Sequence, residues 1–173
     1  MKPRSRVRGP VLFVTVGSTK YDELISKILS EESIELIVAL GFKKVILQVG
    51  QSNYDCDHFE RLKSSVSNQL TLEVYDYKNS IAEDIERADL VVGHAGAGTC
   101  LEVLRNNKRL LVVANENLMD NHQSELADQL EQDNYAIKTT LGHLNENLVR
   151  LCNSETKLDQ FPQKDSSKFE EIF

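Results

Sequence analysis

The sequence of 173 residues contains no tryptophan, three prolines and only three cysteines. The cysteines, Cys56, Cys100 and Cys152, lie too far apart to suggest a disulfide framework or the paired spacing of a zinc site. Scattered thiols of this kind are typical of proteins in a reducing cytosol. The length is sufficient for one α/β domain, which buries about 70% of the surface of its unfolded chain.

Long apolar runs and an excess of positive charge are also missing. No stretch approaches the roughly 20 apolar residues of a membrane-spanning helix, and the apolar run at 11–16 is too short for the core of a signal peptide. We therefore expect that the protein does not cross a membrane by itself. The net charge is −7 and no extended basic face is evident. Both features argue against a nucleic-acid partner, because such binding depends on neutralising phosphates.

One basic cluster lies in residues 1–10, with Lys2, Arg4, Arg6 and Arg8 among prolines and a glycine. This segment could make a weak contact with an acidic membrane surface or partner. Flexible polar segments are common at chain ends. We predict a flexible basic lead-in at 1–10.

Apolar segments rich in β-branched residues alternate about six times with segments of helical periodicity. The alternation predicts an α/β domain over residues 11–152, with a doubly wound parallel sheet of about six strands and helices on both faces. The expected strands span 11–16, 45–49, 70–75, 90–92, 109–114 and 135–137.

The segment at 153–173 is polar, apart from Phe161, Phe169, Ile172 and Phe173. It either frays or forms an arm whose aromatic side chains pack on another surface. We favour a C-terminal helical arm, which could pack on its own domain or on a partner.

Ligands of doubly wound sheets bind outside the carboxyl ends of the strands. The loops expected there hold most of the glycines and much of the amide, hydroxyl and imidazole chemistry of the chain. They span 17–19, 50–53, 76–79, 93–99 and 115–123.

The most informative of these loops lies within DLVVGHAGAGTCLE at 89–102. A buried strand, a glycine turn and a helix N-terminus can bring backbone N–H groups close to a phosphate or a sugar. The same pattern also suits a plain strand-to-helix corner. Thr99 could hold a phosphate oxygen or simply cap the helix, as Ser18 or Thr19 could cap the first helix.

Two further side chains near this turn have two interpretations each. His94 could donate to a phosphate or sugar, or bond only to the backbone. Glu102 could accept two hydrogen bonds from the adjacent hydroxyls of a ribose, or be a solvated residue stabilised by the helix dipole.

A second polar cluster, Asp120–Gln123, could contact the hydroxyl and amide groups of a sugar, while Asp120 could cap the next helix. Several alternatives are excluded by pattern. There is no G-x-S-x-G elbow, no P-loop and no glycosidase pair of acids. The first turn, V-G-S-T, lacks the glycines of a dinucleotide-binding loop.

Three segments together carry a family resemblance: VLFVTVGST at 11–19, ADLVVGHAGAGTCLEVL at 88–104 and NLMDNHQSELADQL at 117–130. The chain resembles the cytosolic donor-binding subunit of the two-part dolichol-linked N-acetylglucosamine transferase. That family is similar to the C-terminal half of the bacterial lipid-linked N-acetylglucosamine transferase (glycosyltransferase family 28). The resemblance runs from about residue 11 to residue 132 and more weakly to the C-terminus. It implies a Rossmann-like half of a GT-B fold.

The resemblance also implies a set of residues that bind UDP-N-acetylglucosamine. The HAGAGT turn would face the diphosphate, Glu102 the ribose, the start of the helix near 121 the sugar, and the loop at 77–78 the uracil. The first glycine turn would lie near the phosphates or the acceptor cleft, although the bacterial turn is richer in glycine. The implied residues are Gly17, Ser18, Thr19, Tyr77, Lys78, His94, Ala95, Gly96, Ala97, Gly98, Thr99, Glu102, Asn121, His122 and Gln123.

The reaction implied is transfer of N-acetylglucosamine from UDP to GlcNAc-diphosphodolichol, with inversion at the anomeric carbon and without an essential metal. A membrane-anchored partner subunit would supply the lipid-linked acceptor and the catalytic base. It would also recruit the chain to the cytosolic face of the endoplasmic reticulum membrane. The alternative is a stand-alone module that binds a nucleotide or sugar phosphate and acts as a regulator.

Overall fold

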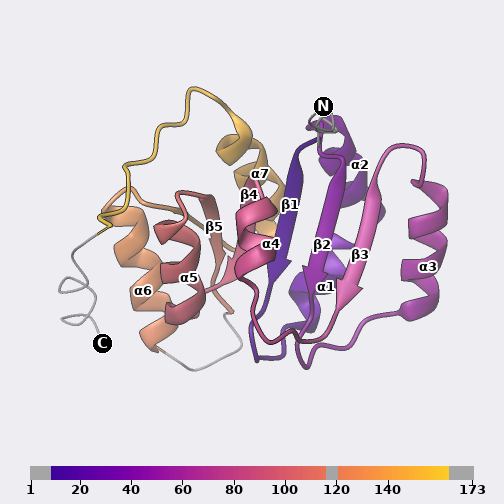
Figure 1. Cartoon of the computed structure of the whole chain (residues 1–173), viewed down its shortest axis with the longest axis horizontal. Helices are drawn as coiled ribbons and strands as arrows, with labels where there is room; N and C mark the ends of the chain where they lie inside the picture. The colour runs from indigo at the N-terminus through magenta and orange to yellow at the C-terminus, as the bar shows by residue number, and fades with distance from the viewer. Residues whose placement is uncertain (1–8, 116–120, 164–173) are drawn as a thin grey trace, which may run out of the picture.

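The computed structural model describes residues 9–115 and 121–163, and for residues 121 and 122 the backbone only. Six parallel strands form one sheet in the order β3-β2-β1-β4-β5-β6 (Figure 1). They are β1 (Val11–Thr15), β2 (Lys44–Gln48), β3 (Thr71–Tyr75), β4 (Leu90–His94), β5 (Arg109–Val113) and β6 (Ile137–Thr139). The predicted Rossmann-like sheet of about six strands is confirmed.

Helices cover both faces of this sheet (Figure 1). One face carries α1 (Asp22–Ile28), α2 (Glu31–Ala39), α3 (Cys56–Ser65) and α7 (Leu144–Cys152), which follows a short 3₁₀ helix, η1 (Leu141–His143). The other face carries α4 (Ala82–Arg87), α5 (Ala97–Arg105) and α6 (Asn121–Gln132). Within the described ranges, none of these helices combines the length and the apolar character that a membrane span requires.

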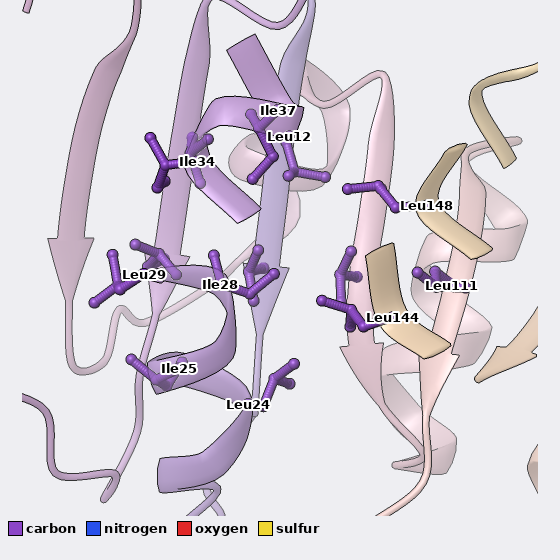
Figure 2. Packing of buried hydrophobic residues seen from close by; sticks show 14 of the residues in the cluster. Leu12, Leu24, Ile25, Ile28, Leu29, Ile34, Ile37, Leu111, Leu144 and Leu148 are labelled. Atoms are coloured by element: carbon purple, nitrogen blue, oxygen red, sulfur yellow. The ribbon is translucent and has the colours of Figure 1, made fainter. Parts of the chain in front are cut away.

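The core lies in two layers because the strands are buried on both faces. In β1, Leu12 and Val14 face the layer of α1, α2 and α7, while Val11 and Phe13 face the layer of α4, α5 and α6. Figure 2 shows leucine and isoleucine side chains of α1, α2 and α7 gathered on the first of these faces. Burial on both faces explains why the strands of this parallel sheet read as nearly continuous apolar runs.

The strand order changes direction between β1 and β4. β1 pairs in parallel with β2 on one side and with β4 on the other, so that Thr15 lies opposite both Gln48 and Gly93. Chain connections therefore leave in opposite directions from this point, and the loops after β1 and β4 meet at the carboxyl edge of the sheet. This edge is the usual ligand site of doubly wound folds.

The start of α1 differs from the sequence-based expectation, whereas the end of α2 agrees with it. Neither Ser18 nor Thr19 caps α1, which has Tyr21 at the cap position and no side-chain cap. The hydroxyl of Thr19 instead donates to the carbonyl of Val16 at 2.8 Å and closes the preceding turn. Gly41, predicted to end α2, does follow it with a left-handed φ of +93°.

The last strand begins two residues later than predicted, at Ile137. The reason is the end of α6, where Asn134 takes a left-handed φ of 60°. The N–H groups of Tyr135 and Ala136 then both donate to the carbonyl of Leu130. These two residues complete the helix end and are not available to the sheet.

The described part of the C-terminal arm, residues 153–163, packs on its own domain. It contains a turn but no helix, so the helical form predicted for the arm is not found in this part. Phe161 is 5% exposed and meets the Tyr135 ring edge-on at a centroid distance of 5.2 Å. The N–H of Asp159 donates to the carbonyl of Asn134 at 2.8 Å. The Arg109 guanidinium also donates to the carbonyls of Leu151 and Thr156. The remaining aromatic residues of the arm, at 169 and 173, lie outside the described residues.

We predict that Phe161→Ala lowers the free energy of unfolding by about 3 kcal/mol, because it removes a buried ring that holds the arm. Urea denaturation followed by circular dichroism measures this change. Val149→Ala is the control, since Val149 is 43% exposed and its truncation should change stability by less than about 0.5 kcal/mol. Equal stabilities of the two variants would mean that the arm does not depend on Phe161.

Candidate functional site

Two glycine turns meet around one imidazole at the switch point between β1 and β4. A Cβ atom on Gly17 would lie 2.7 Å from Cε1 of His94, and a Cβ on Gly96 would lie 2.3 Å from its Nε2. Gly17 also has a left-handed φ of +64°. Both positions therefore require glycine, and the His94 ring lies between the two turns.

His94 ends β4 and is only 7% exposed. Its Nδ1 atom is buried and has no hydrogen-bond partner among the described residues. Burial lowers the pKa of His94 below its ordinary value, and the nearby backbone of Thr15 opposes this only in part. The neutral imidazole carries one donor and one acceptor. A buried nitrogen of this kind is commonly satisfied by a ligand or an ordered water.

Helix α5 begins three residues after this histidine, at Ala97, without a side-chain cap. Gly96 occupies the cap position, and the first bond within the helix runs from the N–H of Cys100 to the carbonyl of Gly96. Thr99 is the third helical residue, so the alternative that it simply caps the helix is excluded. The N–H groups of Ala97, Gly98 and Thr99 precede the first helical bond, and such groups, together with the helix dipole, favour an anion.

Glu102 lies one turn further along the same helix and is half-buried. Its carboxylate has no partner within the described part of the chain. A helix dipole stabilises acidic side chains within the first turn. Glu102 is the sixth residue of α5 and lies beyond that turn. The alternative that the dipole explains this glutamate is therefore weakened.

The loop after β3 is held by a buried carboxylate that the sequence did not reveal. Asp84 of α4 is 2% exposed and accepts hydrogen bonds from the Tyr75 hydroxyl at 2.5 Å and from Nζ of Lys78 at 3.0 Å. The Lys78 ammonium also lies 4.2 Å from the centre of the Tyr75 ring. Burial, together with Asp84, raises the pKa of the Tyr75 phenol. Tyr77 remains 53% exposed at the tip of this loop.

The first glycine turn, Gly17–Thr19, is engaged within the protein. The N–H of Gly17 donates to Oε1 of Gln48 at 2.8 Å, so it is not free to bind a phosphate. Ser18 is exposed, and the Thr19 hydroxyl is used in the turn itself. Gln48 could have been suspected from the sequence, because it is a lone amide at the end of an apolar strand.

The remaining predicted residues, Asn121, His122 and Gln123, are the first three residues of α6. Helix α6 starts two residues earlier than predicted, near the carboxyl end of β5 (Figure 1). Gln123 is half-buried, whereas the side chains of the other two, and the whole of Asp120, lie outside the described residues. The backbone thus brings this segment to the same edge of the sheet as His94 and α5.

Two cavities are lined by other residues. One, of about 410 Å³, opens beyond β5 and β6 beside Tyr21 and His143. The other, of about 440 Å³, lies beneath the arm beside Arg109 and Phe161. Neither is lined by a residue predicted to bind the ligand. In residues 9–115 and 121–163, no three His, Cys, Asp or Glu side chains form a group that could hold a metal ion.

Comparison with known proteins shows to which family the chain belongs. A family model described as the glycosyltransferase family 28 C-terminal domain matches residues 11–172. A Mus musculus protein named UDP-N-acetylglucosamine transferase subunit ALG13 is 40% identical over 162 residues. The aligned region covers 91% of this chain and 13% of the mouse protein, so the chain spans a small part of that relative.

Solved structures agree with this result. An NMR solution structure of ALG13 is 28% identical, covers 96% of both chains and superposes with a TM-score of 0.73. The crystal structure of Acinetobacter baumannii MurG, at 20% identity, has a TM-score of 0.64 and covers 83% of this chain but 42% of its own. The second likeness concerns the fold, and it relates this chain to one part of a longer GT-B structure.

We predict that Gly96→Ala destabilises the fold by about 1–3 kcal/mol, because its Cβ would collide with a buried ring that Gly17 prevents from moving. Gly98→Ala is the matched control, since its Cβ would meet no described atom within 4 Å. Alanine also favours a helix by up to about 1 kcal/mol over glycine. Thermal denaturation compares the two, and equal melting temperatures would contradict the packing described for His94.

The lowered pKa of His94 predicts how stability depends on pH. The folded state favours the neutral ring. The contribution of His94 to the free energy of unfolding is therefore complete above the ordinary histidine pKa of about 6.5 and declines as the pH falls below it. The free energy of unfolding, measured by urea denaturation, should therefore fall more between pH 7.5 and pH 5.5 for wild type than for His94→Gln. A His94→Gln variant with the wild-type loss would contradict the prediction.

Proposed function

The chain belongs to the glycosyltransferase family 28 C-terminal domain family, and on that premise we propose that it binds the donor UDP-N-acetylglucosamine within a transferase. The proposed acceptor is GlcNAc-diphosphodolichol. A relative with 40% identity bears the name of a UDP-N-acetylglucosamine transferase subunit, which supports this donor. The observation that carries the proposal is the uncapped N-terminus of α5 beside the buried His94, at the switch point of the sheet.

The diphosphate is the part of the donor that this arrangement suits best. The N–H groups at the start of α5 are neutral donors in fixed positions, and the helix dipole adds positive potential. As the bond to the sugar breaks, negative charge grows on the leaving diphosphate. Donors that are already in place stabilise that charge without reorganisation. Under this proposal the chain needs no metal to do so.

The other parts of the donor follow from the positions of the loops. Glu102, one turn along α5, would accept hydrogen bonds from the two hydroxyls of the ribose. The loop at Tyr77 and Lys78 would flank the uracil mainly through its backbone, since the Lys78 ammonium already pairs with Asp84. Asn121, His122 and Gln123 would contact the hydroxyl groups of the sugar.

We propose that the acceptor and the catalytic base come from a membrane-anchored partner subunit, which recruits this chain to the cytosolic face of the endoplasmic reticulum membrane. The word subunit in the name of the mouse relative supports a partner. The likeness to 42% of the MurG chain supports a site completed by a second half. The described residues expose two large apolar side chains, Tyr77 and Val149. An extended apolar face for docking a partner is therefore not found among the described residues.

Glu102→Ala should weaken the binding of UDP-N-acetylglucosamine by about 1.5–3 kcal/mol, because a charged, two-point acceptor for the ribose is lost. Calorimetric titration of the purified chain measures this loss. Glu86→Ala is the control, since Glu86 is exposed on α4 and should leave the affinity unchanged. An intact Glu102→Ala protein with wild-type affinity would remove Glu102 from the site.

The dependence on a partner has its own test. The purified chain should transfer no sugar to a GlcNAc-diphospholipid, and a partner recovered with it from membranes should restore transfer. The partner together with Glu102→Ala is the control, and transfer should then fall in line with the lost donor affinity. Transfer by the purified chain alone, with no partner recovered, would favour a self-sufficient enzyme. Donor binding without transfer under any condition would favour a regulatory module.

A further inference from the structure

Gln48 is a buried amide at the end of an otherwise apolar strand. It is the last residue of β2 and is 2% exposed. A buried amide without partners is costly, and this one uses both of its polar ends. Its Oε1 accepts hydrogen bonds from the Thr15 hydroxyl at 2.5 Å, the Val16 N–H at 3.2 Å and the Gly17 N–H at 2.8 Å.

The other end of the amide reaches two different loops. Nε2 donates to the carbonyl of Gly17 at 2.7 Å and to the carbonyl of Asp76 at 2.8 Å. Because N–H groups lie on one side and carbonyls on the other, only one orientation of the amide satisfies all of its partners. Gln48 therefore holds Gly17 by both its N–H and its carbonyl, and ties the turn after β1 to the loop after β3.

These bonds continue into the proposed donor site. The Gly17 turn that Gln48 holds packs against the ring of His94, which in turn packs against Gly96 at the start of α5. On the other side, Asp76 directly precedes Tyr77 and Lys78. One buried side chain thus connects the loop proposed for the diphosphate with the loop proposed for the uracil.

We propose that Gln48 is a positioning residue for the nucleotide of the donor: it contacts no substrate and sets the relative placement of the two loops that bind UDP. This inference rests on the proposed function. It predicts that changing the Gln48 amide impairs the binding of the UDP moiety in protein that remains folded. A residue that only stabilised the fold would change the melting temperature and leave the affinity of the folded protein unchanged.

The test compares Gln48→Glu and Gln48→Met by calorimetric titration with UDP-N-acetylglucosamine at pH 5.5–8, well below each melting temperature. At pH 8 both variants should bind at least about tenfold more weakly than wild type. A glutamate at this position loses both donors and faces two carbonyls, but when protonated it regains one donor. The deficit of Gln48→Glu relative to wild type should therefore shrink as the pH falls, while that of Gln48→Met stays constant.

Controls separate the possible causes of a deficit. Gln69→Glu places the same charge on the exposed turn before β3, at the opposite edge of the sheet, and should keep wild-type affinity. The titratable residues on the contacting loops, His94, Asp76, Tyr77 and Lys78, are present in every variant. Gln48→Met adds no ionisable group, so its pH profile reports their effect alone. Wild-type affinity in folded Gln48 variants would overturn the inference. Failure of the wild type to bind the donor would instead overturn the proposed function.

If neither Gln48 variant folds, a milder variant still tests the positioning role of the amide. Thr15→Val removes the hydroxyl that donates to Oε1 of Gln48 and accepts a longer bond, at 3.3 Å, from the Gly17 N–H. It leaves the two bonds from Nε2 in place. It should weaken binding of UDP-N-acetylglucosamine measurably, by about threefold or more. Wild-type affinity in Thr15→Val would then count against a positioning role of the amide.

Discussion

The contact of the His94 imidazole with Gly17 on one side and Gly96 on the other is the constraint on which the candidate site depends. The two glycines follow strands that pair in the sheet although they are distant in sequence. A side chain on either glycine would displace the ring and with it the start of α5. The close contact thus fixes where the uncapped helix N-terminus lies relative to the first turn. The proposed diphosphate site is a consequence of this packing.

Buried polar groups below the loops after β1 and β3 hold the other part of the candidate site in place. Gln48 joins the loops after β1 and β3, and Asp84 holds Tyr75 and Lys78 at the base of the second loop. Such buried, fully bonded groups keep loops in one arrangement. A site that stabilises a leaving diphosphate with neutral donors needs this rigidity, because its advantage lies in donors that do not have to reorganise.

Much of the fold could be predicted because burial on both faces makes each strand a visible apolar run, and every strand bound agrees within two residues. The differences that remain depend on tertiary contacts. β6 begins late because Tyr135 and Ala136 complete the end of α6, and Thr99 is no cap because Gly96 takes that place. Gln48 was missed because its partners lie up to 33 residues away in sequence. The local pattern shows a lone amide at the end of an apolar strand, but it does not show which groups that amide bonds.

The most direct measurement of the central claim is an NMR titration of the backbone amides with UDP-N-acetylglucosamine, with uridine as the control ligand. If the start of α5 binds the diphosphate, the amide signals of Ala97, Gly98 and Thr99 should shift strongly with the sugar nucleotide and little with uridine. Binding of UDP-N-acetylglucosamine that leaves these three signals in place, while signals elsewhere move, would contradict the account.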